Sequence, residues 1–560
     1  MYFQLQRLLV VDEAARSELL SQLYVSVMTR LTMAQKTLTT LVWLSSVAST
    51  QAAPQVTLPG YGSFVGTTIS QTLTKKPLPK PVDAWLGIDY VSQPVGEARF
   101  APVGPPELFE GVKNATQYGF SCHQDPRDIT YEVNEACLNM NVFRPQNVSA
   151  HEKLPVLVWI HGVNSFGFLP SPVFERLGLL NLGLRDQQSL LEFVQKYIAQ
   201  FGGDASRVTL GGRSAGAHST AIHLFHNYNS SDGASPLFSQ AILQSGSVTA
   251  RSFPNASYPL YQQQFSQYLS LAGCASAANS SDTAILACLR AAPISALENA
   301  STQLWRASEY SITWPFQPTR GGFLLEKAGS QAGKEGLFYR IPTITTNVLD
   351  EAKYYSPGDI STNAEFLAYL HTLIPGLTPA DLQDIEKLYP DPALDPVNGP
   401  YAFSPNSTQY NRLSAALTDY MYVCPGQETA VRMASKGAHV FKAVWAVNNT
   451  FPAWKGVPHT ADTKYTWAEP AGAGGVQYPE VGKQVLHAFF SDFVALGGSP
   501  SVGVRQGVPV WPRYEEKGDG VPGLQLRIEA FGNSRVEGDG VRRVQCEWWR
   551  DEGRAVRLEK

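Results

Sequence analysis

The residues best suited to covalent chemistry are Gly212-Arg213-Ser214-Ala215-Gly216, which match the pattern G-x-S-x-G. The pattern of the surrounding residues predicts a strand before this motif and a helix after it, so the chain must turn sharply at the serine. Such a turn lifts the serine side chain above a sheet, and the flanking glycines leave room for neighbouring backbone. The N–H of Ala215, at the helix start, can donate to a developing oxyanion. We therefore predict that Ser214 is a nucleophile.

A serine hydroxyl reacts poorly at neutral pH unless a base accepts its proton, and the base needs an orienting carboxylate. In enzymes built around this kind of turn, the acid follows the serine and the histidine comes last. Asp350 and Glu351 follow a strand-like run, and either could be the acid. His459 lies in a turn-rich loop and is the candidate base. Three other histidines follow the serine on its predicted helix and are better explained as packing or surface residues: His218, His223 and His226.

The elements around the motif alternate between strands and helices. Nearly every residue over 154–160 is apolar, as in a strand that is buried on both faces. After it we expect, in order, a helix over 186–200, a strand over 207–210, a helix over 215–225 and a strand over 240–243. This alternation predicts an α/β fold with a mostly parallel sheet and right-handed crossovers. We also expect a helical cap over 250–330 and final strands over 527–549.

Composition excludes some classes of function. The 560 residues include 44 Lys and Arg against 48 Asp and Glu, a formal net charge of −4. Without a basic excess the chain lacks the electrostatic attraction on which nucleic-acid binding depends. No apolar run reaches the roughly 18 residues that a membrane-spanning helix needs. With 44% apolar residues the chain can bury a large core, so we expect a globular enzyme without an integral membrane segment.

The residues after Met33 resemble a secretory signal. Lys36 precedes an apolar stretch over 38–48, and small residues follow as far as Pro54. This is the order of charge, apolar core and cleavage site in a signal peptide, although a short buried helix is the alternative. We therefore predict a non-native extension over 1–32 with translation starting at Met33, a signal peptide over 33–53, and a single domain over 54–560.

Potential glycosylation sites also favour export from the cell. The acceptor pattern Asn-x-Ser/Thr is weak at any one position, but it recurs along the chain, and such sites carry glycans only in a secretory pathway. We therefore expect a secreted protein with N-glycans. The acceptor asparagines are Asn114, Asn147, Asn229, Asn255, Asn279, Asn299, Asn406 and Asn448.

The cysteines form an even set without a C-x-x-C pair, which argues against a zinc or redox motif. In a secreted protein, disulfides are the expected state, and buried free thiols are the alternative. Proximity in sequence favours two local bridges, Cys122 with Cys137 and Cys274 with Cys288. The remaining cysteines are Cys424 and Cys546.

Several segments together resemble the type-B carboxylesterase and cholinesterase-like lipase family, in particular its secreted fungal members. The resemblance extends from about Gly87 to Trp549 and implies an α/β-hydrolase fold. It implies Ser214 as the nucleophile, Glu351 as the acid and His459 as the base, and it would pair Cys424 with Cys546. The matching segments are 87–90, 94–96, 99–100, 134–142, 181–187, 201–204 and 511–514, together with Cys122.

The chain departs from the family pattern in two places. Arg213 replaces a residue that is Glu in many relatives, and we expect only a small effect. The family also continues its His-Gly with further glycines, a long loop and another strand, whereas here His161-Gly162 leads directly into Val163. Gly162 and Ala215 are then the remaining candidate oxyanion donors. Loss of one such donor typically lowers kcat by about 10² to 10³. Our hypothesis for the missing segment is a gene model that skips an exon.

The resemblance and the motif together predict a secreted serine hydrolase of carboxylic esters. Ser214 would attack the ester carbonyl of a small molecule to form an acyl-enzyme, which water then hydrolyses. This chemistry requires no metal and no organic cofactor, so we expect none. The alternative is a non-catalytic binding or adhesion protein that keeps the fold, since the missing glycines weaken the oxyanion hole. The sequence pattern favours no particular ester.

Overall fold

The fold is taken from a computed structural model. It describes the backbone of 7–10 and, with side chains, residues 53–71, 77–125, 132–148, 151–160, 164–226, 236–309, 311–449, 451–468, 477–500, 508–515, 522–530 and 532–560.

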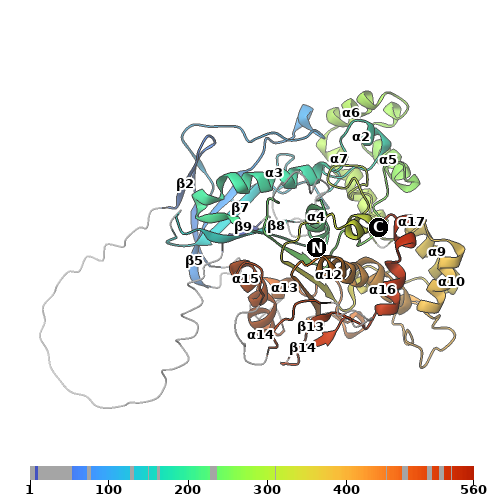
Figure 1. The fold of residues 1–560 in the computed structure, drawn as a ribbon. Helices are drawn as coiled ribbons and strands as arrows, with labels where there is room; N and C mark the ends of the chain where they lie inside the picture. The colour runs from blue at the N-terminus through green and yellow to red at the C-terminus, as the bar shows by residue number, and fades with distance from the viewer. Residues whose placement is uncertain are drawn as a thin grey trace, which may run out of the picture.

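A large twisted sheet forms the centre of the molecule (Figure 1). It has 11 strands in the order β14-β13-β12-β11-β10-β9-β8-β1-β7-β5-β4, and strands β8 to β13 run parallel to one another. The sequence prediction of a mostly parallel α/β sheet is confirmed. The strands are β1 (Arg7–Val10), β4 (Thr67–Gln71), β5 (Pro77–Asp89), β7 (Asn139–Pro145), β8 (Leu154–Ile160), β9 (Gly203–Arg213), β10 (Gln240–Gln244), β11 (Thr343–Val348), β12 (Val440–Trp445), β13 (Leu524–Ile528) and β14 (Arg535–Gly538). A small separate sheet contains β2 (Gln55–Leu58), β3 (Gly62–Val65) and β6 (Val112–Asn114).

The central strands have apolar side chains on both faces. Every residue of β8 is buried, and successive side chains enter two different hydrophobic clusters. Val156 and Val158 belong to one cluster, while Leu157 and Trp159 belong to the other. This alternation explains why the segment reads as an almost continuous apolar run, since neither face meets water.

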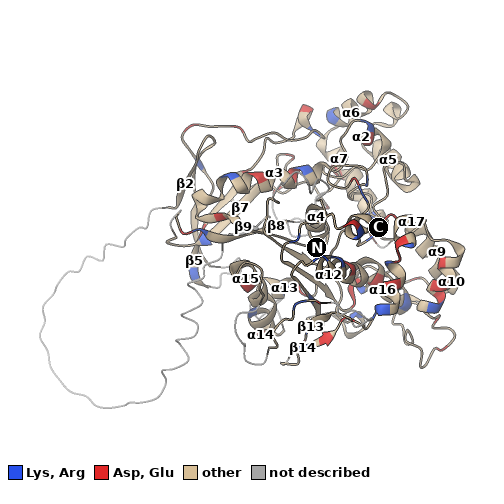
Figure 2. Cartoon of the chain, in the orientation of Figure 1, with Lys and Arg blue, Asp and Glu red and all other residues tan. Residues whose placement is uncertain are grey.

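Helices cover the two faces of the sheet. Figure 1 shows α3 (Leu182–Tyr197) on one side of the strands and α15 (His487–Ala495) on the other. Helix α4 (Ala215–Leu224) packs on β9 and β10, and α12 (Cys424–Ser435) packs on β11 and β12. Among the described residues, no helix is both long and apolar enough to cross a membrane. Figure 2 shows that basic and acidic residues alternate along the outer helices.

The predicted cap region is helical. It contains α5 (Pro259–Leu271), α6 (Asp282–Ala291) and α7 (Ile294–Ser308), which gather at one end of the molecule in Figure 1. Next to them in the same view lie α9 (Asn363–Leu373), α10 (Pro379–Leu388) and α17 (Glu552–Arg557).

The prediction of final strands over 527–549 is only partly correct. Strands β13 and β14 are present, but Arg543–Trp549 forms helix α16. Cys546 and Trp549 lie one helical turn apart and are both buried, so their spacing belongs to a helix face. Cys546 is also bonded to Cys424, which ties α16 to α12. The other disulfides join Cys122 to Cys137 and Cys274 to Cys288.

Strand β1 lies between β7 and β8, antiparallel to β8 and parallel to β7. It comes from the segment over 1–32 that the sequence suggested to be a non-native extension. Most of the predicted signal peptide lies outside the described residues, and the proposed processing of the N-terminal segment stays a prediction.

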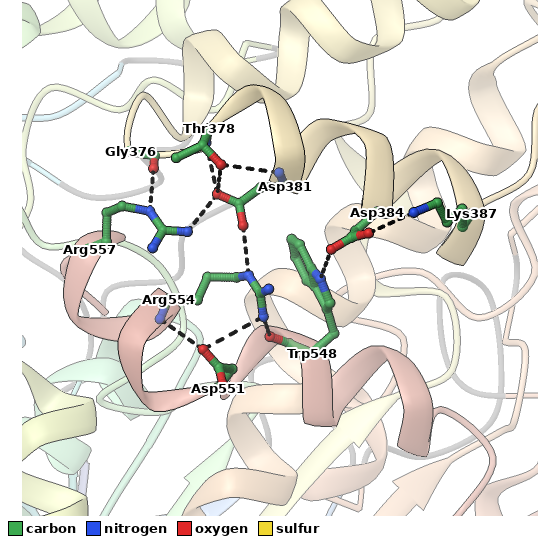
Figure 3. Close-up of polar contacts among 9 residues, drawn as sticks. All are labelled: Gly376, Thr378, Asp381, Asp384, Lys387, Trp548, Asp551, Arg554 and Arg557. Atoms are coloured by element: carbon green, nitrogen blue, oxygen red, sulfur yellow. Dashed lines mark hydrogen bonds and ion pairs between the residues drawn. The ribbon is translucent and has the colours of Figure 1, made fainter.

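Helix α17 is attached to α10 through one carboxylate (Figure 3). Asp381 accepts hydrogen bonds from Arg554 Nε at 2.9 Å and Arg557 Nη2 at 2.6 Å. It also accepts from the backbone N–H and the hydroxyl of Thr378, at 2.8 and 2.7 Å. Burial opposes ionisation, but these four donors together hold the pKa of Asp381 well below its usual range.

Candidate active site

Ser214 occupies the sharp turn between β9 and α4. Its backbone φ of 55° and ψ of −123° are strained for a residue with a side chain. Gly212 is required for this turn because an added Cβ atom would lie 2.4 Å from the carbonyl carbon of Gly216. The glycines and the serine therefore produce the geometry that the motif predicts.

The three residues that the sequence suggested as a triad lie together at the carboxyl ends of the parallel strands. His459 Nε2 is 2.8 Å from Ser214 Oγ, and His459 Nδ1 is 2.5 Å from Glu351 Oε2. The Glu351 side chain is fully buried, and His459 is only 3% exposed. A proton can therefore pass from the serine to an imidazole whose orientation a shielded carboxylate fixes.

The structure distinguishes Glu351 from its neighbour Asp350. Glu351 Oε1 accepts the N–H of Val348 at 2.8 Å, which orients the other carboxylate oxygen toward the imidazole. Asp350 instead accepts the N–H of Val457 at 2.9 Å and pairs with Lys353 at 3.3 Å. Asp350 thus anchors the loop that carries the histidine, while Glu351 contacts the ring itself.

One of the two candidate oxyanion donors can be located. Ala215 begins α4, so its N–H is among the first-turn donors that have no partner within the helix. It lies beside Ser214 in the chain, at the positive end of the helix dipole. Gly162 falls outside the described residues, which stop at Ile160 and resume at Asn164.

Two tyrosines that the sequence reading missed enclose the imidazole. The ring centroids of Tyr355 and Tyr422 lie 5.6 and 5.0 Å from that of His459. The two tyrosine hydroxyls are hydrogen-bonded to each other. No sequence signal could have identified this aromatic wall, because Tyr422 follows Tyr355 only after a long intervening segment.

Buried polar side chains lie next to the loop that carries His459. Asp462, three residues after His459, accepts a hydrogen bond from Gln244 Nε2 at 2.7 Å. Burial raises the pKa of Asp462, and the positive charge of Arg213 acts in the opposite direction. Arg213, which stands where many relatives of the resembled family have Glu, therefore faces an acidic group in this structure.

The remaining histidines near the motif have structural surroundings. His218 and His223 are buried on α4, and burial lowers the pKa of each to about 3, so both stay neutral. His218 contacts the backbone of Ser247, and His223 contacts Gln187. His226 pairs with Glu326 at 3.5 Å. None of the three replaces His459 beside the serine.

Comparison with known proteins gives consistent matches over most of the chain. A sequence model of the carboxylesterase family matches residues 52–166 and 163–534. The two matched segments meet next to Gly162, where the chain departs from the resembled family. Secreted lipase 4 of Gibberella zeae is 48% identical over 562 residues, covering 93% of this chain and 99% of the relative. Acetylcholinesterase 1 of Caenorhabditis briggsae is 27% identical, covering 84% of each chain.

A solved structure has the same fold. The crystal structure of Aspergillus niger EstA superposes with a TM-score of 0.75 at 25% sequence identity, covering 91% of this chain and 99% of that chain. The resemblance to an α/β-hydrolase is thereby confirmed at the level of the fold.

Proposed function

Because the chain belongs to the carboxylesterase family and is a carboxylic ester hydrolase, we propose that Ser214, His459 and Glu351 are its catalytic triad. The observation that supports this most directly is the continuous hydrogen-bond path from Ser214 Oγ through His459 to Glu351. His459 accepts the serine proton as Ser214 attacks the ester carbonyl, and then donates it to the departing alcohol. Water hydrolyses the acyl-enzyme by the reverse proton path.

We propose that the N–H of Ala215 stabilises the negative oxygen of the tetrahedral intermediate, with Gly162 as a second donor. The family pattern has further glycine donors at this point. The family model matches this chain in two segments, which meet at 163–166. The chain as written is therefore expected to hydrolyse esters slowly. This shortage of donors is also what favours the second candidate, a non-catalytic esterase-like binding protein.

An ester hydrolysis assay on four proteins separates these possibilities. We expect p-nitrophenyl butyrate to be hydrolysed by the chain as written, and Ser214→Ala to abolish the rate. Insertion of the corresponding segment of a relative after Gly162 should raise kcat by about 10² to 10³, which is the effect of an oxyanion donor. Ser214→Ala in the restored chain is the matched control. If Ser214→Ala matched its parent in both backgrounds, the proposed catalytic role of this serine would be wrong.

We further propose that the protein is secreted as a single glycosylated domain over 54–560 after removal of a signal peptide over 33–53. The relative from Gibberella zeae is described as a secreted lipase, which supports export. A reporter fused to residues 33–60 should appear in the medium. Retention of that fusion inside the cell would contradict the signal-peptide assignment.

A further inference from the structure

Strand β1 lies inside the central sheet, although it comes from the far N-terminal end of the chain. Its four residues pair in parallel with 141–143 of β7 and antiparallel with 156–159 of β8. The sheet continues beyond both of these neighbours, to β4 on one side and β14 on the other. β1 is therefore bonded on both sides and is not a strand added to an outer edge.

Without β1, the sheet would contain an open slot between β7 and β8. Neighbouring strands lie about 4.7 to 4.9 Å apart, so β7 and β8, with one strand between them, are roughly 9 to 10 Å apart and cannot bond to each other. The slot is bordered by fully buried residues, among them Val142, Val156 and Val158. An empty slot would leave buried backbone N–H and C=O groups unpaired, which folded proteins avoid. The slot therefore requires an extended strand.

The directions of β7 and β8 allow more than one kind of strand to fill the slot. Since β1 is parallel to β7 and antiparallel to β8, these two strands run in opposite directions. A strand of either direction between them has one parallel and one antiparallel neighbour, and it can form a hydrogen-bonded ladder with each. The slot thus selects an extended backbone without selecting the direction of the chain.

β1 is shorter than the two strands that border it. It has four residues, whereas β7 and β8 have seven each. Its pairing with β8 ends at Trp159, one residue before β8 ends at Ile160. His161-Gly162 follows directly, and this is the point after which the family pattern has a further strand that the chain lacks. A longer strand supplied there would pair with more of both borders than β1 does.

From these observations we infer that the slot between β7 and β8 is a binding site for an extended strand, which residues 7–10 occupy in place of the strand that the family has after His-Gly. The inference concerns folding and does not depend on the proposed triad. It applies to the chain as written, in which residues 7–10 belong to the fold. In a chain that starts at Met33, the slot is free for the restored segment.

Hydrogen exchange on the full-length chain tests the position of β1 without a substitution. In peptides that cover residues 7–10, amide exchange should be slowed by about 10³-fold or more, as for groups that open only with the whole fold. With the relative's segment inserted after Gly162, the same amides should exchange as in an open chain, because the restored strand fills the slot. Fast exchange in the chain as written, or equal protection in both chains, would overturn the inference. Protection found only in a dimer would place a second copy's strand in the slot and would also overturn it.

A proline substitution measures what the bonded backbone of β1 contributes. Leu9→Pro removes an N–H group from a strand that is bonded on both sides, where proline is not tolerated. In urea titrations of the chain as written, Leu9→Pro should raise the equilibrium constant for unfolding about 10- to 100-fold, because a buried acceptor loses its partner. The restored chain should be unaffected. Leu20→Pro lies outside β1 and is the matched control. If Leu9→Pro destabilised both chains equally, or had no more effect than Leu20→Pro, residues 7–10 would not be the strand that fills the slot.

Discussion

At the scale of the residue, the two adjacent acids after β11 have different expected effects on catalysis. Glu351 contacts His459 at 2.5 Å, whereas Asp350 contacts the backbone of Val457. Glu351→Gln should lower kcat by about 10⁴, the typical effect of neutralising the acid of such a triad. Asp350→Asn keeps an acceptor for Val457 and should remain within about tenfold of the parent. Steady-state ester hydrolysis checks both variants, and a larger loss in Asp350→Asn would reverse the assignment.

A second residue-scale prediction concerns pH and Asp186. Burial raises the pKa of this carboxyl on α3 to about 7 in the folded protein, whereas an unfolded chain releases the proton near pH 4. Folding therefore takes up a proton between about pH 4 and pH 7, and the folded state loses stability as the pH rises through this window. Asp186→Asn removes the buried charge and should stabilise the protein at pH 8 by about 2 kcal/mol.

Chemical unfolding of Asp186→Asn and the parent at pH 8 and pH 4.5 measures this effect. The difference in unfolding free energy should shrink toward zero at the lower pH, where Asp186 is protonated in the folded state. A difference that is the same at both values would mean that the pKa of this carboxyl is not raised in the folded protein.

The serine could be predicted from its local motif, whereas the choice of acid needed the resemblance to a family and the aromatic wall carried no sequence signal. Ser214 and its glycines occupy five consecutive residues, but His459 and Glu351 lie 108 residues apart in the chain. The residues alone gave His459 as the candidate base and left Asp350 and Glu351 as alternatives for the acid, and the resemblance implied Glu351. Tyr355 and Tyr422 carry no signal, because their role comes from packing against an imidazole that folding brings to them.

At the scale of the element, one acid on α10 accepts hydrogen bonds from two arginines of the C-terminal helix α17. Asp381 on α10 joins Arg554 and Arg557 of α17 (Figure 3). Its folded pKa is depressed, so it stabilises the protein above about pH 4 and the contribution is lost as the pH falls further. Asp381→Asn should destabilise the protein by about 2 kcal/mol at pH 7, because charge-assisted hydrogen bonds from two partly exposed arginines are lost.

Thermal unfolding as a function of pH tests this contribution, with Asp384→Asn as the control. Asp384 also lies on α10, but its side chain is 42% exposed and pairs with Lys387 at the surface, so its loss should have little effect. The loss of thermal stability in Asp381→Asn, relative to the parent protein, should become smaller as the pH falls toward 3. If the loss of stability in Asp381→Asn were the same at low pH, the charge of the Asp381 carboxylate would make no contribution to stability.

The elements differ in how well the sequence predicts them, and burial explains why. Strand β8 was predictable because both of its faces are buried and its residues are almost all apolar. Helix α16 was mistaken for strand because it is short and presents only one buried face, through Cys546 and Trp549. The pairing of β1 with β7 and β8 joins distant segments, and no local pattern marks such a contact.

At the scale of the whole molecule, export would leave a defined pattern of glycans. Five described acceptor asparagines are exposed, namely Asn114, Asn147, Asn279, Asn299 and Asn406. Asn448 is partly buried, and its side-chain nitrogen donates to the backbone oxygens of Phe451 and Gly456. We therefore expect glycans on the exposed set and none on Asn448. Peptide mapping of protein secreted by a fungal host measures the occupancy, and a glycosylated Asn448 would contradict this account.

The catalytic claim is tested most directly by covalent labelling of the nucleophile. Treatment with a fluorophosphonate ester, followed by peptide mass spectrometry, identifies the serine that the folded protein activates. We expect a single adduct on Ser214, which is absent in Ser214→Ala and forms far more slowly in His459→Ala. Labelling that persists in Ser214→Ala, or that proceeds equally fast without His459, would contradict the proposed triad.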